Sequence, residues 1–132
     1  MSRIRSKNTR PELLVRSLLH LEGYRFRLHA RDLPGRPDIV LPKWKTAVFV
    51  NGCFWHRHKG CVYAYTPKTG KVFWRKKFLA NVRRDATKAE ALASLGWRVE
   101  IVWECELAHP EELRKRLLLI KKRAAKHALP LR

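Results

Sequence analysis

Residues 46–61 read TAVFVNGCFWHRHKGC, an apolar run that passes directly into a stretch rich in cysteine and histidine. The short apolar run at 46–50 is typical of a central strand that is buried on both faces. The stretch at 51–61 holds two cysteines, two histidines and an adjacent Phe-Trp pair. A metal site, a recognition loop, a catalytic loop and a crowded turn are all compatible with this composition.

The segments on either side of this stretch predict further strands. Residues 38–41 are followed by a Pro-Lys-Trp-Lys turn, so we expect them to form a hairpin with 46–50. The sequence YRFRLHA at 24–30 alternates large apolar residues with Arg and His, which indicates a half-exposed strand. The sequence WRVEIVW at 97–103 alternates in the same way and predicts another strand.

Three helices are expected around these strands. Thr9 and Glu12 have the spacing of a capping box, and Gly23 marks the end of the helix that follows. Residues 73–94 form a long amphipathic segment, and Pro110 opens a last helix. The apolar positions at helical spacing are Leu14, Leu18 and Leu21 in the first helix, Trp74, Phe78, Val82, Ala86, Ala89 and Leu92 in the second, and Leu113, Leu117, Ile120 and Ala124 in the third.

The order α-β-β-β-loop-α-β-α predicts an α/β fold, a three-layer α/β/α domain with a mixed sheet. The 132 residues are enough for one domain with a single core, and neither an internal repeat nor an interdomain linker is visible. We therefore expect a single domain over 1–132, with the polar and basic residues 1–8 as a flexible arm.

The net charge of +19, from 30 Lys and Arg against 11 Asp and Glu, is spread along the whole chain. Such a charge repels itself in a compact domain and favours a polyanionic partner, nucleic acid above all. An anionic membrane surface and an RNA-packing role are the alternatives. There is no apolar run of ~18 residues and no secretory signal at the start, and the odd count of three cysteines indicates a reducing, cytoplasmic compartment.

The three cysteines suggest a metal site. Cys53, His58 and Cys61 lie close together in sequence, and Cys105 follows at the end of the strand at 97–103. Three thiolates and one imidazole are a standard ligand set for structural zinc, and zinc would order a loop of about twenty residues that has little structure of its own. His56 is another possible ligand. The alternative is that the cysteines are small buried side chains and that His58 is solvated.

Acidic and aromatic residues near this loop have two interpretations each. Asp38 follows a Gly-Pro turn at the head of a strand, where it could hold a hard cation or only stabilise the turn. His56 could be a general base near neutral pH or a solvated loop residue. Phe54, Trp55 and Trp74 could be core residues, or wedges that enter between base steps of DNA.

The segments SKNTRPE, LPGRPDIVLP, VFVNGCFWHRHKGC and GWRVEIVWECEL resemble, in this order, the very-short-patch repair (Vsr) mismatch endonucleases, over about residues 5–107. The resemblance implies a restriction-endonuclease-like core with a structural zinc site. It implies an enzyme that uses Mg²⁺ to nick one strand of duplex DNA beside a T:G mismatch. It also implies double-stranded DNA as the partner and a bacterial cytoplasmic, nucleoid-associated location. We expect a monomer, since a single mismatch has no two-fold symmetry.

The resemblance also assigns roles to residues. Asp38 matches the aspartate that binds Mg²⁺, His56 the catalytic histidine, and Glu12 a glutamate that orders water around the metal. The zinc ligands would be Cys53, His58, Cys61 and Cys105. The DNA-contacting residues would be Phe54, Trp55 and Trp74, which intercalate, and Asn81 and Asp85 on the polar face of the long helix.

Val50 and Asn51 depart from the family pattern, which has Thr and His there in some members. Val50 can still offer its backbone carbonyl to Mg²⁺, and Asn51 can hydrogen-bond water in the catalytic site but cannot carry a proton. These departures keep two alternatives open: a related nicking endonuclease with another DNA target, and a catalytically weak, zinc-stapled DNA-binding module.

Overall fold

The structure is a computed structural model that describes residues 9–128, and the side chains of residues 9–123. The expected flexible arm, residues 1–8, lies outside the described residues. The elements are α1 (Arg10–Leu21), β1 (Arg27–Leu28), β2 (Ile39–Leu41), β3 (Thr46–Asn51), α2 (Lys71–Ser94), β4 (Arg98–Trp103) and α3 (Pro110–Ala128), with short 3-10 turns η1 (Pro42–Trp44) and η2 (Glu104–Ala108). This order confirms the predicted succession of helices and strands.

The four strands form one sheet in the order β1-β2-β3-β4. The predicted hairpin is present: β2 pairs with β3 antiparallel, and Lys45 closes the turn between them in the left-handed conformation at φ 49°. β3 and β4 are parallel, which requires a crossover connection, and the loop at 52–70 together with α2 provides it. The sheet is therefore mixed, as the sequence predicts.

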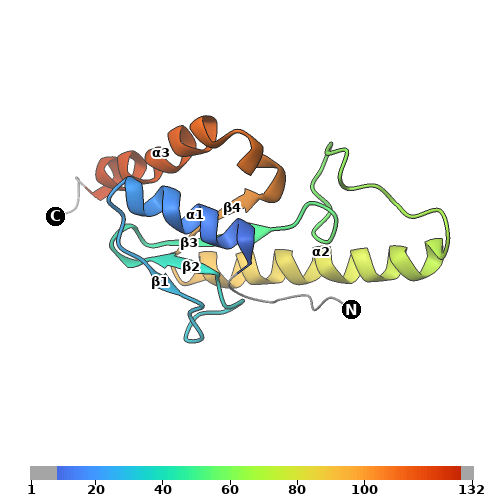
Figure 1. Ribbon diagram of the computed structural model, residues 1–132. Coiled ribbons are helices and arrows are strands. Elements are labelled where there is room, and N and C mark those ends of the chain that lie inside the picture. The colour runs from blue at the N-terminus through green and yellow to red at the C-terminus, as the bar shows by residue number, and fades with distance from the viewer. Residues whose placement is uncertain (1–8, 129–132) are drawn as a thin grey trace.

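Helices cover both faces of the sheet and give three layers. Figure 1 shows α1 and α3 on one side of the strands and α2 on the other. The main core lies under α1 and α3, where alternate residues of the strands meet the helices. Its fully buried members include Val15, Leu19, Ile39, Leu41, Val48, Val102, Leu113, Leu117 and Ile120.

Helix α2 differs from the predicted pattern of burial. Phe78 and Leu92 are buried, but Val82 is 44% exposed and Ala86 is also exposed. The physical reason is length: 24 helical residues span about 36 Å, whereas a six-residue strand spans about 20 Å. The N-terminal half of α2 therefore extends past the sheet and lies beside the loop at 52–70 (Figure 1).

Two further predictions need correction. In α1 the buried side is formed by Val15 and Leu19, while Leu14 and Leu21 are 46% and 69% exposed. The strand expected at 24–30 is reduced to Arg27–Leu28. Tyr24 explains the shortening, because its ring is buried under α3 and its Oη donates a hydrogen bond to the carbonyl of Leu117 at 2.5 Å.

In α3 the apolar positions Leu113, Leu117 and Ile120 are buried, and the side chain of Ala124 lies outside the described residues. None of the helices within residues 9–128 has both the length and the apolar character that crossing a membrane requires.

Candidate active site and metal centre

A cavity of about 730 Å³ opens where β2 begins and β3 ends. The antiparallel register that pairs Ile39 with Val48 brings Asp38, just before β2, next to the last residues of β3. The start of α1, the loop at 52–70 and the C-terminal half of α2 contribute further walls. The lining residues include Glu12, Gly35, Asp38, Phe49, Val50, Asn51, Trp55, His56, Lys88 and Glu104. The tertiary structure thus brings together all four residues expected to be catalytic.

Asp38 is a partly buried carboxylate that lines this cavity. Its Oδ2 accepts a hydrogen bond from the backbone N–H of Val50 at 2.8 Å. Burial raises the pKa of Asp38 to about 6, and the nearby charge of Glu12 adds to this effect against the hydrogen bond from Val50. A carboxylate held in this way is costly to ionise alone, so a bound cation would stabilise its charged form.

Glu12 is only 2% exposed and lies at the first turn of α1. The N-cap half of the predicted capping box is present, since Thr9 Oγ1 accepts a hydrogen bond from the Glu12 N–H at 3.3 Å. The Glu12 carboxylate itself turns elsewhere: Oε2 lies 2.5 Å from His29 Nε2 and accepts from Arg16 at 3.0 Å. These two cationic or polar partners explain how a carboxylate can remain buried beside Asp38.

His56 lies in the loop after β3, and its Nδ1 is 2.7 Å from Oδ2 of Asp85 on α2. When an aspartate accepts a hydrogen bond from one ring nitrogen, the other nitrogen is free to act as a base. This contact orients the His56 ring and is compatible with the expected role of a general base that acts through Nε2.

Val50 and Asn51 are neighbours in β3 and both line the cavity. Asn51 is 6% exposed, so its amide is a buried polar group beside Asp38 and His56. These positions agree with the expectation that both residues belong to the catalytic site, and their roles remain a prediction.

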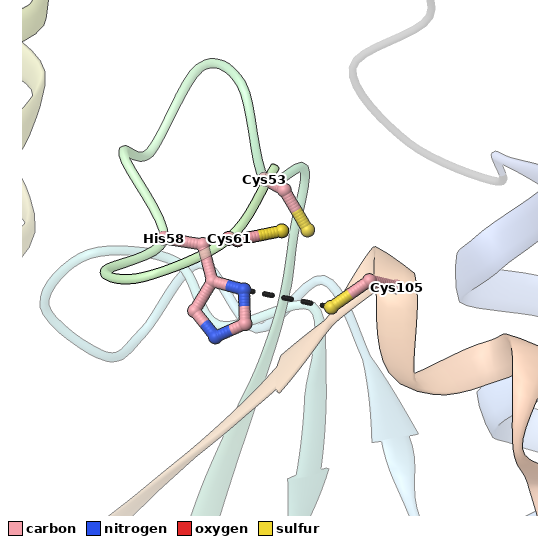
Figure 2. A group of neighbouring side chains, drawn as sticks. All are labelled: Cys53, His58, Cys61 and Cys105. Carbon is pink, nitrogen blue, oxygen red and sulfur yellow. Dashed lines mark hydrogen bonds between the residues drawn. The ribbon is translucent and has the colours of Figure 1, made fainter. Parts of the chain in front are cut away.

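A second cluster lies beside the first. Cys53, His58, Cys61 and Cys105 converge from the loop and from η2, and their ligand atoms all lie within 4.8 Å of one another (Figure 2). Sulfur ligands of tetrahedral zinc are about 3.8 Å apart, so small adjustments would suffice to close a site. His58 Nδ1 lies 3.5 Å from Cys105 Sγ, so Nδ1 is the ring nitrogen that is placed to bind a metal together with the cysteines. The donor set fits zinc in number, type and spacing.

The thiols of this cluster affect one another. Burial, followed by the neighbouring thiols, raises the pKa of Cys105 to about 12, and burial also raises the pKa of Cys53. Three thiolates this close repel each other unless a cation lies between them. The His58 ring stacks on Trp103 with a centroid separation of 4.2 Å, which fixes its orientation toward the cysteines. Such contacts around a ligand are a usual feature of metal sites.

The loop that joins the two clusters is ordered by Arg57. Its guanidinium donates to the carbonyls of Phe54, Ala64 and Tyr65 and lies 3.8 Å above the ring of Phe78. A planar group with several donors can satisfy these partners together. No sequence signal pointed to this role, because Arg57 lies among many basic residues.

The side chains of Phe54, Trp55 and Trp74 contact one another and form one aromatic cluster. The Phe54 ring lies between 5.0 and 5.6 Å from those of Trp55, Tyr65, Trp74 and Phe78. Trp55 is 39% exposed at the edge of the cavity. The three predicted aromatic residues are therefore brought together, and Trp55 offers the accessible edge.

Asn81 and Asp85 occupy one side of α2, one turn apart, and both contact the loop. Asn81 Nδ2 donates to the carbonyl of Trp55 at 3.0 Å, and Asp85 contacts His56. They thus position the loop against α2, which sequence reasoning did not foresee. A carboxylate four residues after an asparagine on an amphipathic helix is too common a pattern to indicate this pairing.

Comparison with known proteins identifies the family. Residues 1–62 match the family described as DNA mismatch endonuclease Vsr. The chain is 56% identical over 117 residues to the Type II nicking enzyme V.XorIIP of Xanthomonas oryzae pv. oryzae, covering 89% of this chain and 85% of the relative. It is 42% identical over 113 residues to the DNA mismatch endonuclease Vsr of Escherichia coli, covering 86% of this chain and 72% of the relative.

A solved structure supports the fold. The catalytic domain of the homing endonuclease I-Bth0305I matches with a TM-score of 0.62 at 22% identity, and the match covers 89% of this chain and 98% of that domain. The mixed sheet with helices on both faces is thus the restriction-endonuclease-like core that the resemblance implied. Together with the sequence matches, this places the chain in the Vsr family of DNA endonucleases.

Proposed function

We propose that this endonuclease uses Mg²⁺ to nick one strand of duplex DNA beside a T:G mismatch, in very-short-patch repair. The observation that carries the proposal is the meeting of Asp38, Glu12, Asn51 and the His56–Asp85 pair around one cavity beside an aromatic cluster. The name of the E. coli relative, a mismatch endonuclease, supports the mismatch as target, and that of V.XorIIP, a nicking enzyme, supports the cutting of one strand.

The donors that line the cavity around Asp38 fit a hard cation. Asp38 supplies a carboxylate, and Val50 would add its backbone carbonyl. When bound, Mg²⁺ would neutralise charge on the scissile phosphate. His56 Nε2 would accept the proton of the attacking water, while Asp85 holds the ring in the required tautomer. Asn51 would orient water by hydrogen bonding and Glu12 would order it further.

The aromatic residues and the basic surface would select the site on DNA. A mismatched pair is weakly stacked and therefore easier to open than a matched one. Trp55, with Phe54 and Trp74 behind it, would enter the stack beside the mismatch. Lys and Arg side chains would bind the phosphates irrespective of sequence. Asn81 would contribute near the DNA through its position beside Trp55.

Zinc is proposed as the structural ion of the Cys53, His58, Cys61 and Cys105 cluster. It would tie the loop at 52–70 to η2 and so keep His56 and Trp55 in place. We further propose that the protein acts as a monomer, in the bacterial cytoplasm at the nucleoid.

A nicking assay tests the function. Each strand of a duplex with one T:G mismatch is labelled in turn, Mg²⁺ is added, and a matched T:A duplex is treated in parallel. We expect cleavage of the T strand of the mismatched duplex, and Asp38→Ala should abolish cleavage while leaving DNA binding. Cleavage by Asp38→Ala at the parent rate would contradict the assignment of Asp38.

The assay also separates the alternatives. Equal cleavage of both duplexes would indicate a nicking endonuclease with another target, which the nicking-enzyme names of several relatives favour as the second candidate. Tight binding without cleavage of either duplex would indicate a DNA-binding module that has lost catalysis.

A further inference from the structure

Lys88 is a cation in the catalytic cavity to which no role has been given so far. It lies on α2 one turn after Asp85, on the side of the helix that faces the sheet. Its side chain is partly buried and lines the cavity together with Asp38 and Asn51. A lysine on a basic helix is ordinarily a solvated surface residue, so its place in this cavity needs an explanation.

The stem of Lys88 follows a defined path. A methyl group at Gly35 would lie 2.8 Å from both Cβ and Cγ of Lys88 and 3.1 Å from Cδ. The backbone at Gly35 is left-handed, with φ 76°, which favours glycine independently. The lysine stem therefore lies directly on the turn before Asp38. Its Nζ is 5.9 Å from the ring centroid of Phe49, another wall of the cavity.

The charge of Lys88 is available to a ligand. The described ion pairs involve other cations, and none joins Lys88 to a carboxylate among residues 9–123. Lys88 is nevertheless close enough to Asp38 to lower the pKa of that carboxyl, as a smaller effect than burial. An ammonium near the metal-binding carboxylate, but not paired with it, can bind an anion placed between them.

We propose that Lys88 is a catalytic residue, whose ammonium donates a hydrogen bond to a non-bridging oxygen of the scissile phosphate beside Asp38. This inference rests on the proposed function. Water attack forms a new P–O bond and breaks the bond to the leaving sugar oxygen. The proton of the water goes to His56, and the leaving oxygen takes a proton from solvent. Lys88 keeps its proton throughout, and stabilises the negative charge that builds up on the phosphate oxygens.

Single-turnover nicking of the labelled T:G duplex at saturating protein tests this role. Lys88→Met removes the charge and keeps the stem that packs on Gly35. We expect the cleavage rate to fall about 10²- to 10³-fold, with the Kd for the duplex in magnesium-free buffer changed by less than about threefold. The matched control is Lys76→Met, which removes the same charge from an exposed position of α2 outside the cavity and should leave the cleavage rate unchanged.

Lys88→Arg separates charge from packing. If the ammonium acts on the phosphate, Arg should restore part of the rate, because it is also a cationic donor. The inference is overturned if Lys88→Met cleaves within about threefold of the parent rate, or if Arg and Met slow cleavage equally while both lower the melting temperature. If the parent protein cleaves neither duplex, the proposed function itself fails and this inference fails with it, a result visible without any variant.

Discussion

The two ring nitrogens of His56 have different surroundings, and the chemistry expected of this residue depends on that difference. Nδ1 lies 2.7 Å from Asp85 Oδ2, and in the proposed mechanism this contact holds the proton on Nδ1 and leaves Nε2 as the base. Asp85 was expected from the sequence to face DNA, and its contact with His56 gives it a second task. The role of Asp85 can be separated from the general effect of removing one negative charge by a control substitution at another carboxylate.

Asp85→Asn keeps the shape of the side chain but not its charge. We expect the nicking rate to fall about 10²- to 10⁴-fold, because the amide neither fixes the tautomer of His56 nor stabilises the protonated ring. Single-turnover kinetics measure the loss. Asp32→Asn is the control, since Asp32 is an exposed carboxylate that pairs with Arg27 far from His56 in the chain. Equal rates for Asp85→Asn and the parent would exclude His56 as an oriented base.

Asp38 makes the stability of the protein depend on pH when Mg²⁺ is absent. Its pKa is about 6 in the folded protein and near 3.8 when unfolded, so between these values the folded state holds a proton that the unfolded state has released. This contribution to stability is complete below about pH 4 and is lost as the pH rises through 6, amounting to about 3 kcal/mol at most.

Urea unfolding at pH 5 and pH 7.5 in magnesium-free buffer measures this effect. Asp38→Asn cannot ionise, so the difference in unfolding free energy between Asp38→Asn and the parent should grow in favour of the variant as the pH rises. A difference that stays constant with pH would show that Asp38 is not held in the way described.

At the scale of elements, the loop at 52–70 and α2 depend on each other. The loop has no helix or strand of its own, and the contacts that order it come from the cysteine cluster, from Arg57 and from α2. The loop carries His56 and Trp55, so the geometry of the active site depends on these contacts. Metal binding and local folding should therefore be coupled.

Cys105→Ser tests this coupling, because Cys105 is the member of the cysteine cluster that lies on η2 and not on the loop. We expect about one equivalent of zinc in the parent protein and far less in the variant, with a lower melting temperature and lost nicking. Ala108→Ser is the control, since it lies in the same 3-10 turn and removes no ligand. Metal analysis that finds less than half an equivalent in carefully purified parent would refute the zinc proposal.

At the scale of the whole molecule, the net charge of +19 governs how DNA is approached. Contacts between Lys or Arg and phosphates release counterions, which makes binding depend steeply on salt and hardly at all on base sequence. In the proposed function, the mismatch would be distinguished by stacking and deformation, which salt affects little.

We therefore expect the affinity for both duplexes to fall together, by roughly 10³-fold or more between about 50 and 200 mM salt if six or more phosphates are contacted. Fluorescence anisotropy in magnesium-free buffer measures this for T:G and T:A duplexes. The ratio of the two affinities should stay nearly constant. Affinity that is insensitive to salt would mean that the basic surface does not bind the backbone.

The sequence by itself determined the order of elements, the hairpin of β2 and β3, and the four members of the cysteine–histidine cluster. Local signals suffice for these features: an apolar run bounded by turns predicts a buried strand, and cysteines with a histidine predict a metal site. The resemblance to a family then assigned roles to six of the residues that line the cavity.

Only the tertiary structure decided which residues meet. The pairing of β3 with β4, the contact of Asp85 with His56 and the place of Lys88 over Gly35 all join segments that are distant in sequence. Periodicity shows which side of a helix is apolar, but not how far the helix extends past the sheet or what lies opposite its polar side. Val82 is exposed and Lys88 lines the cavity, because burial depends on the packing partner as well as on the side chain itself.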